Sequence, residues 1–232
     1  MRVFVAGAAG AIGRHLISLL IGAGHDVTGT TRSKERAERL ASAGARPIIV
    51  DAYDRDALRA AVAGARPDVV VHELTDLGRG FDAENIASNG RLREVGTRNL
   101  VDAAVAARAG RLVAASGAWL YADGPLPHDE SHPLRKPTGD PSDADLRGIL
   151  ELERAVLGTP GIDGIVLRYG FFYGPDAAFR AENAPEPHVS VEAAARATAA
   201  AVERGPAGIY NVVDDNNAIT NARARNLLGW QP

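Results

Sequence analysis

Residues 2–24 read RVFVAGAAGAIGRHLISLLIGAG, and this stretch decides the fold. The mostly apolar run 2–6 predicts a short buried strand that ends at a glycine. Apolar side chains then recur at helical spacing, at Ile12, Leu16, Leu19 and Leu20, until glycines at 22 and 24 end the pattern. The stretch therefore predicts a strand, a glycine-rich turn and a helix.

The turn carries three glycines spaced three residues apart, Gly7, Gly10 and Gly13. Glycine at such positions lets the backbone turn sharply, approach a pyrophosphate closely and pack the helix against the strand. The backbone N–H groups that open the helix, at Ala11 and Ile12, then point toward phosphate oxygens. We interpret the stretch as a dinucleotide-binding turn, although tight strand-to-helix turns also use glycine without a ligand.

The same scheme of strand and helix repeats along the chain. Continuous apolar runs at 26–31, 47–50, 68–74, 111–115 and 165–167 predict further strands, with amphipathic helices between them. Continuous runs indicate a parallel sheet covered on both faces, so the expected fold class is α/β with a doubly wound Rossmann sheet. We assign residues 1–170 to an NAD(P)-binding Rossmann domain and 171–232 to a small C-terminal substrate lobe, interleaved with it as one structural unit.

Composition narrows the kinds of partner that we expect. The 232 residues carry a net charge of −3, which favours neither nucleic acid nor an anionic membrane. There are no cysteines and the histidines show no metal-ligand spacing, so we expect no metal site. No apolar run reaches the length of a membrane span, and the chain starts directly with a strand. We therefore expect a cytoplasmic protein that binds a small-molecule substrate.

The end of the second strand predicts the choice of dinucleotide. A carboxylate there would bind the ribose 2′-hydroxyl of NAD, whereas an arginine would pair with the 2′-phosphate of NADP. The strand ends Thr30, Thr31, Arg32, Ser33, without a carboxylate, so NADP is favoured and NAD stays open. The other interpretation of Arg32 is a solvated charge at the start of a helix.

Six segments, taken in order, match one known family. They are GAAGAIG (7–13), Asp51 with Ala52 at the end of the third strand, VVVHEL (69–74), EVGTRNLVDAA (94–104), VLRYGFFYGP (166–175) and LLGWQP (227–232). Together they resemble the extended short-chain dehydrogenase/reductases, also called NAD-dependent epimerase/dehydratases. The resemblance implies a nicotinamide dinucleotide in the Rossmann domain and a small lobe over the substrate.

The resemblance also places individual residues by position. Glu73 and Leu74 would line the cofactor, and Tyr169 and Gly170 would lie near the nicotinamide carboxamide. Asp51 ends a strand where a side chain can reach the adenine, or it is an ordinary turn residue.

The helix expected at 143–157 lacks the family's catalytic pair. Members of the family carry a tyrosine and, four residues on, a lysine that lowers the pKa of the phenol. Alignment on Glu153 puts Asp145 and Ile149 at these two positions. Alignment on Glu151 restores neither side chain.

A different group must therefore move the proton if the chain is catalytic. The family's serine lies in the loop after the fifth strand, where this chain has Ser116. Tyr121 is the nearest phenol along the chain and Tyr173 is the second choice, although Tyr121 could equally serve only to pack its loop. Arg91 and Arg93 could reach a substrate phosphate, or they form a polar helix face.

We predict an NADP-dependent oxidoreductase or epimerase with a non-standard catalytic site, acting as a monomer or homodimer on a small-molecule carbonyl or secondary alcohol. The alternative is a non-catalytic NAD(P)-binding sensor or interaction protein with the same fold. The chain is shorter than the family between 176 and 188 and again at 220–221. This indicates either a reduced substrate lobe over an open cleft or omitted stretches, and the abrupt join after residue 220 favours omission.

Overall fold

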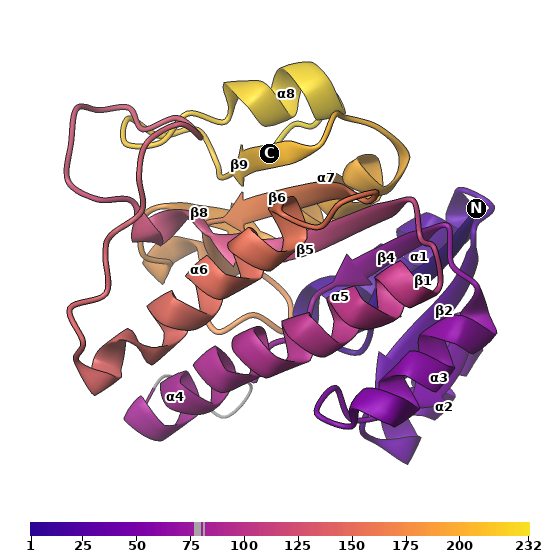
Figure 1. The fold of residues 1–232 in the computed structure, drawn as a ribbon. Helices are drawn as coiled ribbons and strands as arrows, with labels where there is room; N and C mark the ends of the chain where they lie inside the picture. The colour runs from indigo at the N-terminus through magenta and orange to yellow at the C-terminus, as the bar shows by residue number, and fades with distance from the viewer. Residues whose placement is uncertain (77–79, 81) are drawn as a thin grey trace.

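The computed structural model describes residues 1–76, 80 and 82–232 (Figure 1). Its centre is a sheet of seven parallel strands in the order β3-β2-β1-β4-β5-β6-β9. The strands are β1 (Arg2–Ala6), β2 (Asp26–Thr31), β3 (Arg46–Ile49), β4 (Val69–His72), β5 (Arg111–Gly117), β6 (Asp163–Tyr169) and β9 (Gly208–Val212). The order reverses between β1 and β4, which is the crevice where doubly wound sheets bind ligands.

Helices cover both faces of the sheet (Figure 1). One layer contains α1 (Ala11–Gly22), α2 (Lys34–Ser42) and α7 (Val191–Glu203), and the other contains α3 (Arg55–Ala65), α5 (Thr97–Ala106) and α6 (Ala144–Leu157). The predicted doubly wound Rossmann fold is therefore confirmed.

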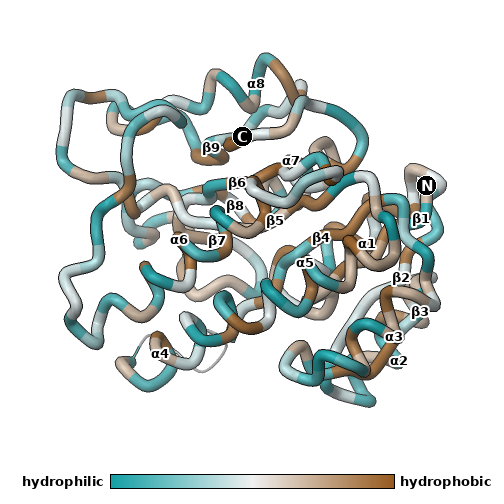
Figure 2. Tube along the Cα trace, viewed as in Figure 1, coloured by the Kyte–Doolittle hydropathy of each residue, from teal (hydrophilic) through white to brown (hydrophobic). Residues whose placement is uncertain are grey.

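The strands are apolar on both sides because each side packs against a helix layer. Val3 and Val5 of β1 belong to the core under α1 and α7, whereas Phe4 between them belongs to the core under α3, α5 and α6. Figure 2 shows the resulting hydrophobic strands between helices with one hydrophilic face. Burial on both faces explains why the strand sequences do not alternate.

The long helix expected from 88 to 109 is interrupted. It consists of α4 (Ala83–Arg91), a π-helical turn (Leu92–Gly96) and α5, which ends at Ala106. A π turn inserts an extra residue into the helix and rotates the side chains that follow it. Arg93 of this turn is buried and lines the crevice.

Residues after 170 serve both the sheet and the crevice. β7 (Phe171–Tyr173) and β8 (His188–Ser190) form a separate pair of strands, whereas β9 pairs with β6 at the edge of the main sheet. Asn221, just before α8 (Ala222–Leu228), donates a side-chain hydrogen bond to the Val213 carbonyl (2.8 Å). The join after residue 220 is a packed turn, and the choice between a reduced substrate lobe and omitted stretches stays a prediction.

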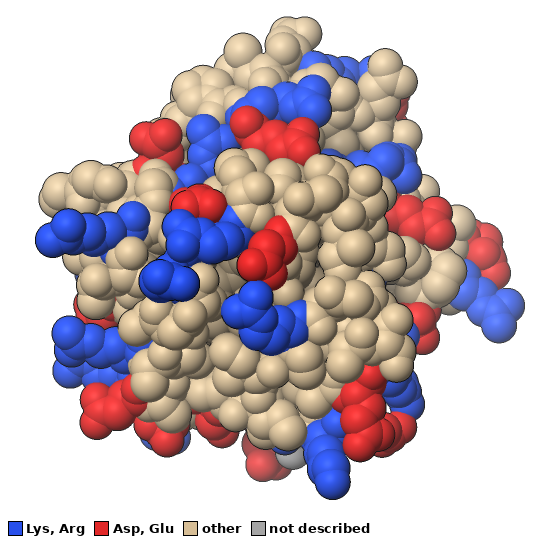
Figure 3. Space-filling model, turned by 90° about the vertical axis from the view of Figure 1, so that its right-hand side faces the viewer, with Lys and Arg blue, Asp and Glu red and all other residues tan. Residues whose placement is uncertain are grey.

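Positive and negative side chains are intermixed on the face shown in Figure 3. None of the described helices is long and apolar enough to cross a membrane. Within the described part of the chain, no group of three His, Cys, Asp or Glu side chains is arranged to hold a metal ion.

Candidate active site

A cavity of about 580 Å³ lies at the carboxyl ends of the central strands. Its walls come from the turn after β1, the ends of β4, β5 and β6, the π turn, and the segment that follows β6. Of the predicted site residues, those that line it are Gly10, Ala11, Ile12, Gly13, Glu73, Ser116, Tyr169 and Gly170.

The glycine turn after β1 has the shape that a pyrophosphate requires. Gly7 has φ +88°, and a Cβ there would lie 2.3 Å from the Glu73 carbonyl oxygen. A Cβ on Gly13 would lie 2.5 Å from the Ala8 carbonyl oxygen, so the helix packs directly on the strand. Gly10 lines the cavity, directly before α1. No described side chain caps α1, so the first N–H groups of this helix are free to bind an anion. The residues therefore fit a dinucleotide phosphate.

The end of β2 lies next to this turn. The Ser33 hydroxyl caps α2 by accepting from the Arg36 N–H (3.3 Å), and the Thr31 hydroxyl accepts from the Ser33 N–H (3.2 Å). The Arg32 guanidinium lies 3.2 Å from the Asp76 carboxylate and stays more than half exposed. Arg36, one helical turn beyond Arg32, lines the cavity, which spacing along α2 could have predicted.

Three further predicted residues lie at strand ends outside the cavity lining. The Asp51 carboxylate is exposed and accepts from the Tyr53 N–H (3.0 Å), as in an ordinary turn. Ala52 is buried, and its carbonyl accepts from the Asn99 side chain (2.9 Å). Leu74 is half-buried and packs on the core beside α5. Their roles toward an adenine stay predictions.

Ser116 lies in the cavity wall and is tied to a buried ion pair. Its hydroxyl donates to Glu153 (2.6 Å), and Glu153 accepts two hydrogen bonds from Arg168 (2.9 and 2.7 Å). Glu151, by contrast, forms a pair with Arg154, whose side chain is largely exposed. The buried pair favours Glu153 as the residue that aligns with the family's glutamate.

With that alignment, Asp145 and Ile149 stand where the family has tyrosine and lysine. Ile149 is fully buried. Asp145 accepts from the Asn89 side chain (2.6 Å) and lies 3.5 Å from Nε of Arg93. The cation that faces Asp145 thus comes from the π turn and not from α6.

Tyr121 is not among the residues that line the cavity. Its hydroxyl donates to Asn211 (2.6 Å), and its ring packs under the Arg168 guanidinium, 5.0 Å from the ring centroid. Burial raises the pKa of its phenol. Its contact with Ser116 is indirect, through Arg168 and Glu153.

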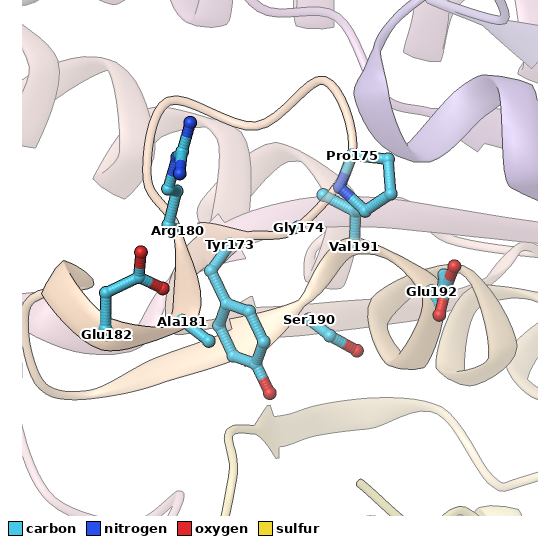
Figure 4. A pocket seen from close by; sticks show the side chains of 9 residues that line it. All are labelled: Tyr173, Gly174, Pro175, Arg180, Ala181, Glu182, Ser190, Val191 and Glu192. Atoms are coloured by element: carbon cyan, nitrogen blue, oxygen red, sulfur yellow. The ribbon is translucent and has the colours of Figure 1, made fainter.

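Tyr173 lines a separate pocket of about 420 Å³, together with Arg180 and Ser190 (Figure 4). Its hydroxyl donates to Asp214 (2.8 Å), and burial together with that carboxylate raises the pKa of the phenol to about 12. Neither predicted phenol therefore reaches the main cavity in this structure.

Glu73 is a buried acid in the cavity wall. Burial raises the pKa of its carboxyl to about 8, against weak hydrogen bonds from Tyr169 and Thr198 (both 3.4 Å). The sequence predicted that Glu73 lies beside the cofactor, but it did not predict that this side chain could donate a proton. A carboxylate next to an apolar strand was the available signal.

Arg93 is a buried cation in the cavity wall, where its residue is 3% exposed. Its Nε and Nη1 atoms have no hydrogen-bond partner within the part of the chain that the structure describes. Arg91 instead lies over the Tyr53 ring, 5.6 Å from its centroid. Of the two arginines considered from the sequence, the structure brings only Arg93 into the cavity wall.

Comparison with known proteins places this site in a class. The model of the NAD-dependent epimerase/dehydratase family matches residues 3–212, so the chain belongs to that family. Its members are NAD(P)-dependent oxidoreductases and epimerases of the short-chain dehydrogenase/reductase type, and this chain is an enzyme of that class.

Two relatives of known activity are similar in sequence. A 3-diazoavenalumate denitrifying reductase from a Streptomyces species is 40% identical over 240 residues, covering 94% of this chain and 77% of that protein. A 4-hydroxy-2-methyl-3-oxo-4-farnesyl-3,4-dihydroquinoline-1-oxide ketoreductase from Stigmatella aurantiaca is 36% identical over 184 residues, covering 76% of this chain and 52% of that protein.

Solved structures show the same fold. UDP-glucose 4-epimerase from Thermotoga maritima, solved with UDP-glucose, superposes with a TM-score of 0.78 at 18% identity, covering 100% of this chain and 94% of that chain. A putative epimerase from Burkholderia cenocepacia superposes with a TM-score of 0.75 at 26% identity, covering 96% of this chain and 78% of that chain.

Proposed function

We propose that the protein transfers hydride between NADP(H) and a small-molecule carbonyl compound or secondary alcohol. The observation that carries this proposal is one cavity that joins a phosphate-binding glycine turn to Ser116 and a buried carboxyl, that of Glu73. The two relatives of known activity are both named reductases, which supports reduction over epimerisation.

The residues present fit NADP. The first N–H groups of α1 would hold the pyrophosphate, with Gly10 leaving room for it. Arg32 and Arg36 would pair with the 2′-phosphate, since β2 ends without a carboxylate. Asp76 holds Arg32 at this place, and a bound phosphate would compete with that carboxylate for the guanidinium.

The chain itself must supply a proton when a carbonyl is reduced. The bound nicotinamide supplies the hydride, and the substrate oxygen then needs an acid within hydrogen-bonding reach. Glu73, with a pKa near 8, is mostly protonated at neutral pH and faces the cavity. The Tyr121 proton is held by Asn211. We therefore favour Glu73 over Tyr121 as the proton donor, with Ser116 as a hydroxyl that positions the substrate oxygen.

The test follows NADPH consumption by the purified protein against aldehydes, ketones, quinones and sugar nucleotides. With any substrate found, Glu73→Gln should lower kcat about 10²-fold or more, because the amide cannot donate an acidic proton. NADPH affinity should change less than about twofold, since the glycine turn is untouched. Tyr121→Phe is the matched control and should keep most of the turnover.

Each other result has a defined meaning. Loss of turnover in Tyr121→Phe with normal turnover in Glu73→Gln would restore Tyr121 as the donor. Binding of NADPH without turnover across the panel would favour the sensor alternative. Absence of NADPH binding would contradict the proposed function itself.

A further inference from the structure

We propose that the cavity binds a flat aromatic acid, with the anionic group of the substrate bound to Arg93 and its ring bound against a cluster of aromatic side chains. This inference rests on the proposed function and names the substrate class for the same site. Two independent features of the cavity carry it, the unsatisfied guanidinium and the aromatic side chains in its wall.

The guanidinium of Arg93 has hydrogen-bonding capacity that the described residues do not use. It is almost fully buried, and Nε and Nη1 have no hydrogen-bond partner in the described part of the chain. Buried arginine N–H groups are ordinarily paired, and a carboxylate can accept two of them side by side. The π turn, a feature often found at functional sites, places this side chain in the cavity wall.

The carboxylates nearby do not fill that role. Asp145 lies 3.5 Å from Nε, longer than the roughly 2.8 Å of a charge-assisted hydrogen bond, and it already accepts from Asn89. Asp176, which also lines the cavity, is paired with Arg14 at 2.9 Å. Glu73 is mostly neutral at pH 7 because burial raises its pKa to about 8. An incoming anion therefore meets an available cation and little opposing charge.

Part of the cavity wall is aromatic. Five of the chain's twelve Phe, Tyr and Trp residues line this one cavity: Trp119, Tyr169, Phe171, Phe172 and Phe179. The rings of Trp119 and Phe171 are stacked with centroids 4.7 Å apart, and Phe179 meets Phe171 edge-on at 6.1 Å. Such faces and edges favour stacking of a further planar ring. A sugar ring offers no comparable π surface.

The experiment measures binding by calorimetry on the full chain, with cinnamate, its neutral methyl ester, and 3-cyclohexylpropanoate as probes. Cinnamate should bind at least about tenfold more tightly than either of the other two, because only it combines the anion with a planar ring. Arg93→Gln should weaken cinnamate binding about tenfold, or ~1.4 kcal/mol. The same variant should change the affinity for the ester by less than about twofold. The cinnamate affinity of Arg93→Lys should lie between those of the unmutated protein and Arg93→Gln.

Arg98→Gln is the matched control. Arg98 lies five residues further on, is largely exposed and pairs with Glu94, so its loss should leave cinnamate affinity unchanged. NADPH affinity of Arg93→Gln is measured in parallel and should stay within about twofold. A tenfold loss of NADPH binding would assign Arg93 to a cofactor phosphate and overturn the proposal.

Two affinity comparisons on the unmutated protein test the proposal even if Arg93→Gln fails to fold. Equal affinities for cinnamate and its ester would refute the anion site, and equal affinities for cinnamate and 3-cyclohexylpropanoate would refute the aromatic site. Normal NADPH binding in that same preparation would show that the proposed function survives while this inference fails.

Discussion

Two neighbouring residues at the end of β4 show how burial acts on an acid and on a base. His72 and Glu73 point to opposite sides of the sheet, and both are almost fully buried. Burial penalises the charged form, so it lowers the pKa of His72 to about 4 and raises that of Glu73 to about 8. Both side chains are therefore mostly neutral at pH 7, which keeps this part of the crevice low in charge.

The Glu73 shift predicts how stability depends on pH. The unfolded chain releases this proton near pH 4.5, whereas the folded chain keeps it until about pH 8. The contribution of Glu73 to stability is therefore fully present below pH 4.5 and is lost as pH rises toward 8. His72 titrates below pH 6.5 and contributes the opposite slope there, so the range from 6.5 to 8 isolates Glu73.

We expect the free energy of unfolding to fall by about 2 kcal/mol between pH 6.5 and 8. Urea denaturation at a series of pH values measures it. Glu73→Gln should flatten the slope in this range, because an amide has no proton to lose. An equal slope in the variant would assign the pH dependence to other groups.

We expect Arg32 to set the cofactor preference. NADPH should bind at least about tenfold more tightly than NADH, a difference of ~1.4 kcal/mol, because only NADPH carries the 2′-phosphate. Arg32→Ala should remove most of that gap while leaving NADH affinity unchanged. Arg39→Ala is the control, since Arg39 is exposed on α2, the helix that begins just after Arg32, and pairs with Glu35. Fluorescence titration measures both ligands, and equal affinities in the unmutated protein would contradict the NADP assignment.

Among the elements, α4 and α6 are packed closely enough to bring their backbones into contact. A Cβ on Gly90 would lie 2.3 Å from the Ala144 carbonyl oxygen, and one on Gly148 would lie 2.4 Å from the Gly90 carbonyl oxygen. This contact places α4 so that Asn89 and Arg93 reach Asp145 on α6. The position of the charged group in the cavity thus depends on two glycines that touch no ligand.

Gly90→Ala should therefore destabilise the protein by about 2 kcal/mol or more, because backbone cannot move aside as a flexible side chain can. Gly64→Ala is the matched control. Gly64 lies in α3, where a Cβ meets no atom within 4 Å, so alanine should stabilise the helix by up to about 1 kcal/mol. Thermal unfolding compares the two, and similar shifts in Tm would argue against the close helix crossing.

At the scale of the whole molecule, the end of the chain is tied back to the Rossmann core. The indole N–H of Trp230 donates to the Ala193 carbonyl (2.8 Å), and its ring is 3% exposed within the core under α1 and α7. Arg111, at the start of β5, donates to the carbonyls of Ala201, Arg204 and Gly205. We expect these contacts to join the last sixty residues and the core into one cooperative unit.

Trp230→Ala should cost about 3–5 kcal/mol of unfolding free energy, as expected for a large buried aromatic side chain. Trp230→Phe keeps most of the ring and loses the hydrogen bond, so it should cost clearly less. Denaturation followed by circular dichroism measures both, with a single transition expected. A stability loss below 1 kcal/mol in Trp230→Ala would mean that the C-terminal segment folds separately from the core.

Much of the fold was predictable because its signals are local. The glycine turn after β1, the continuous apolar strands and the helix at 143–157 are confirmed within a few residues. The π turn was not predicted, because its sequence is compatible with a regular helix and its geometry depends on packing against α6. The pairing of β9 with β6 joins residues far apart in sequence, and apolar periodicity cannot assign such a partner.

The sequence by itself determined the Rossmann fold, the glycine-rich turn after β1 and the absence of the Tyr and Lys pair, because each of these depends on which residue stands at which position. Only the tertiary structure decided which charged groups share the cavity. Tyr121 lies a few residues from Ser116 yet donates its proton to Asn211, whereas Glu73 and Arg93 reach the cavity from β4 and the π turn. The pKa of Glu73 is set by the atoms that surround it, and those atoms come from segments more than one hundred residues apart.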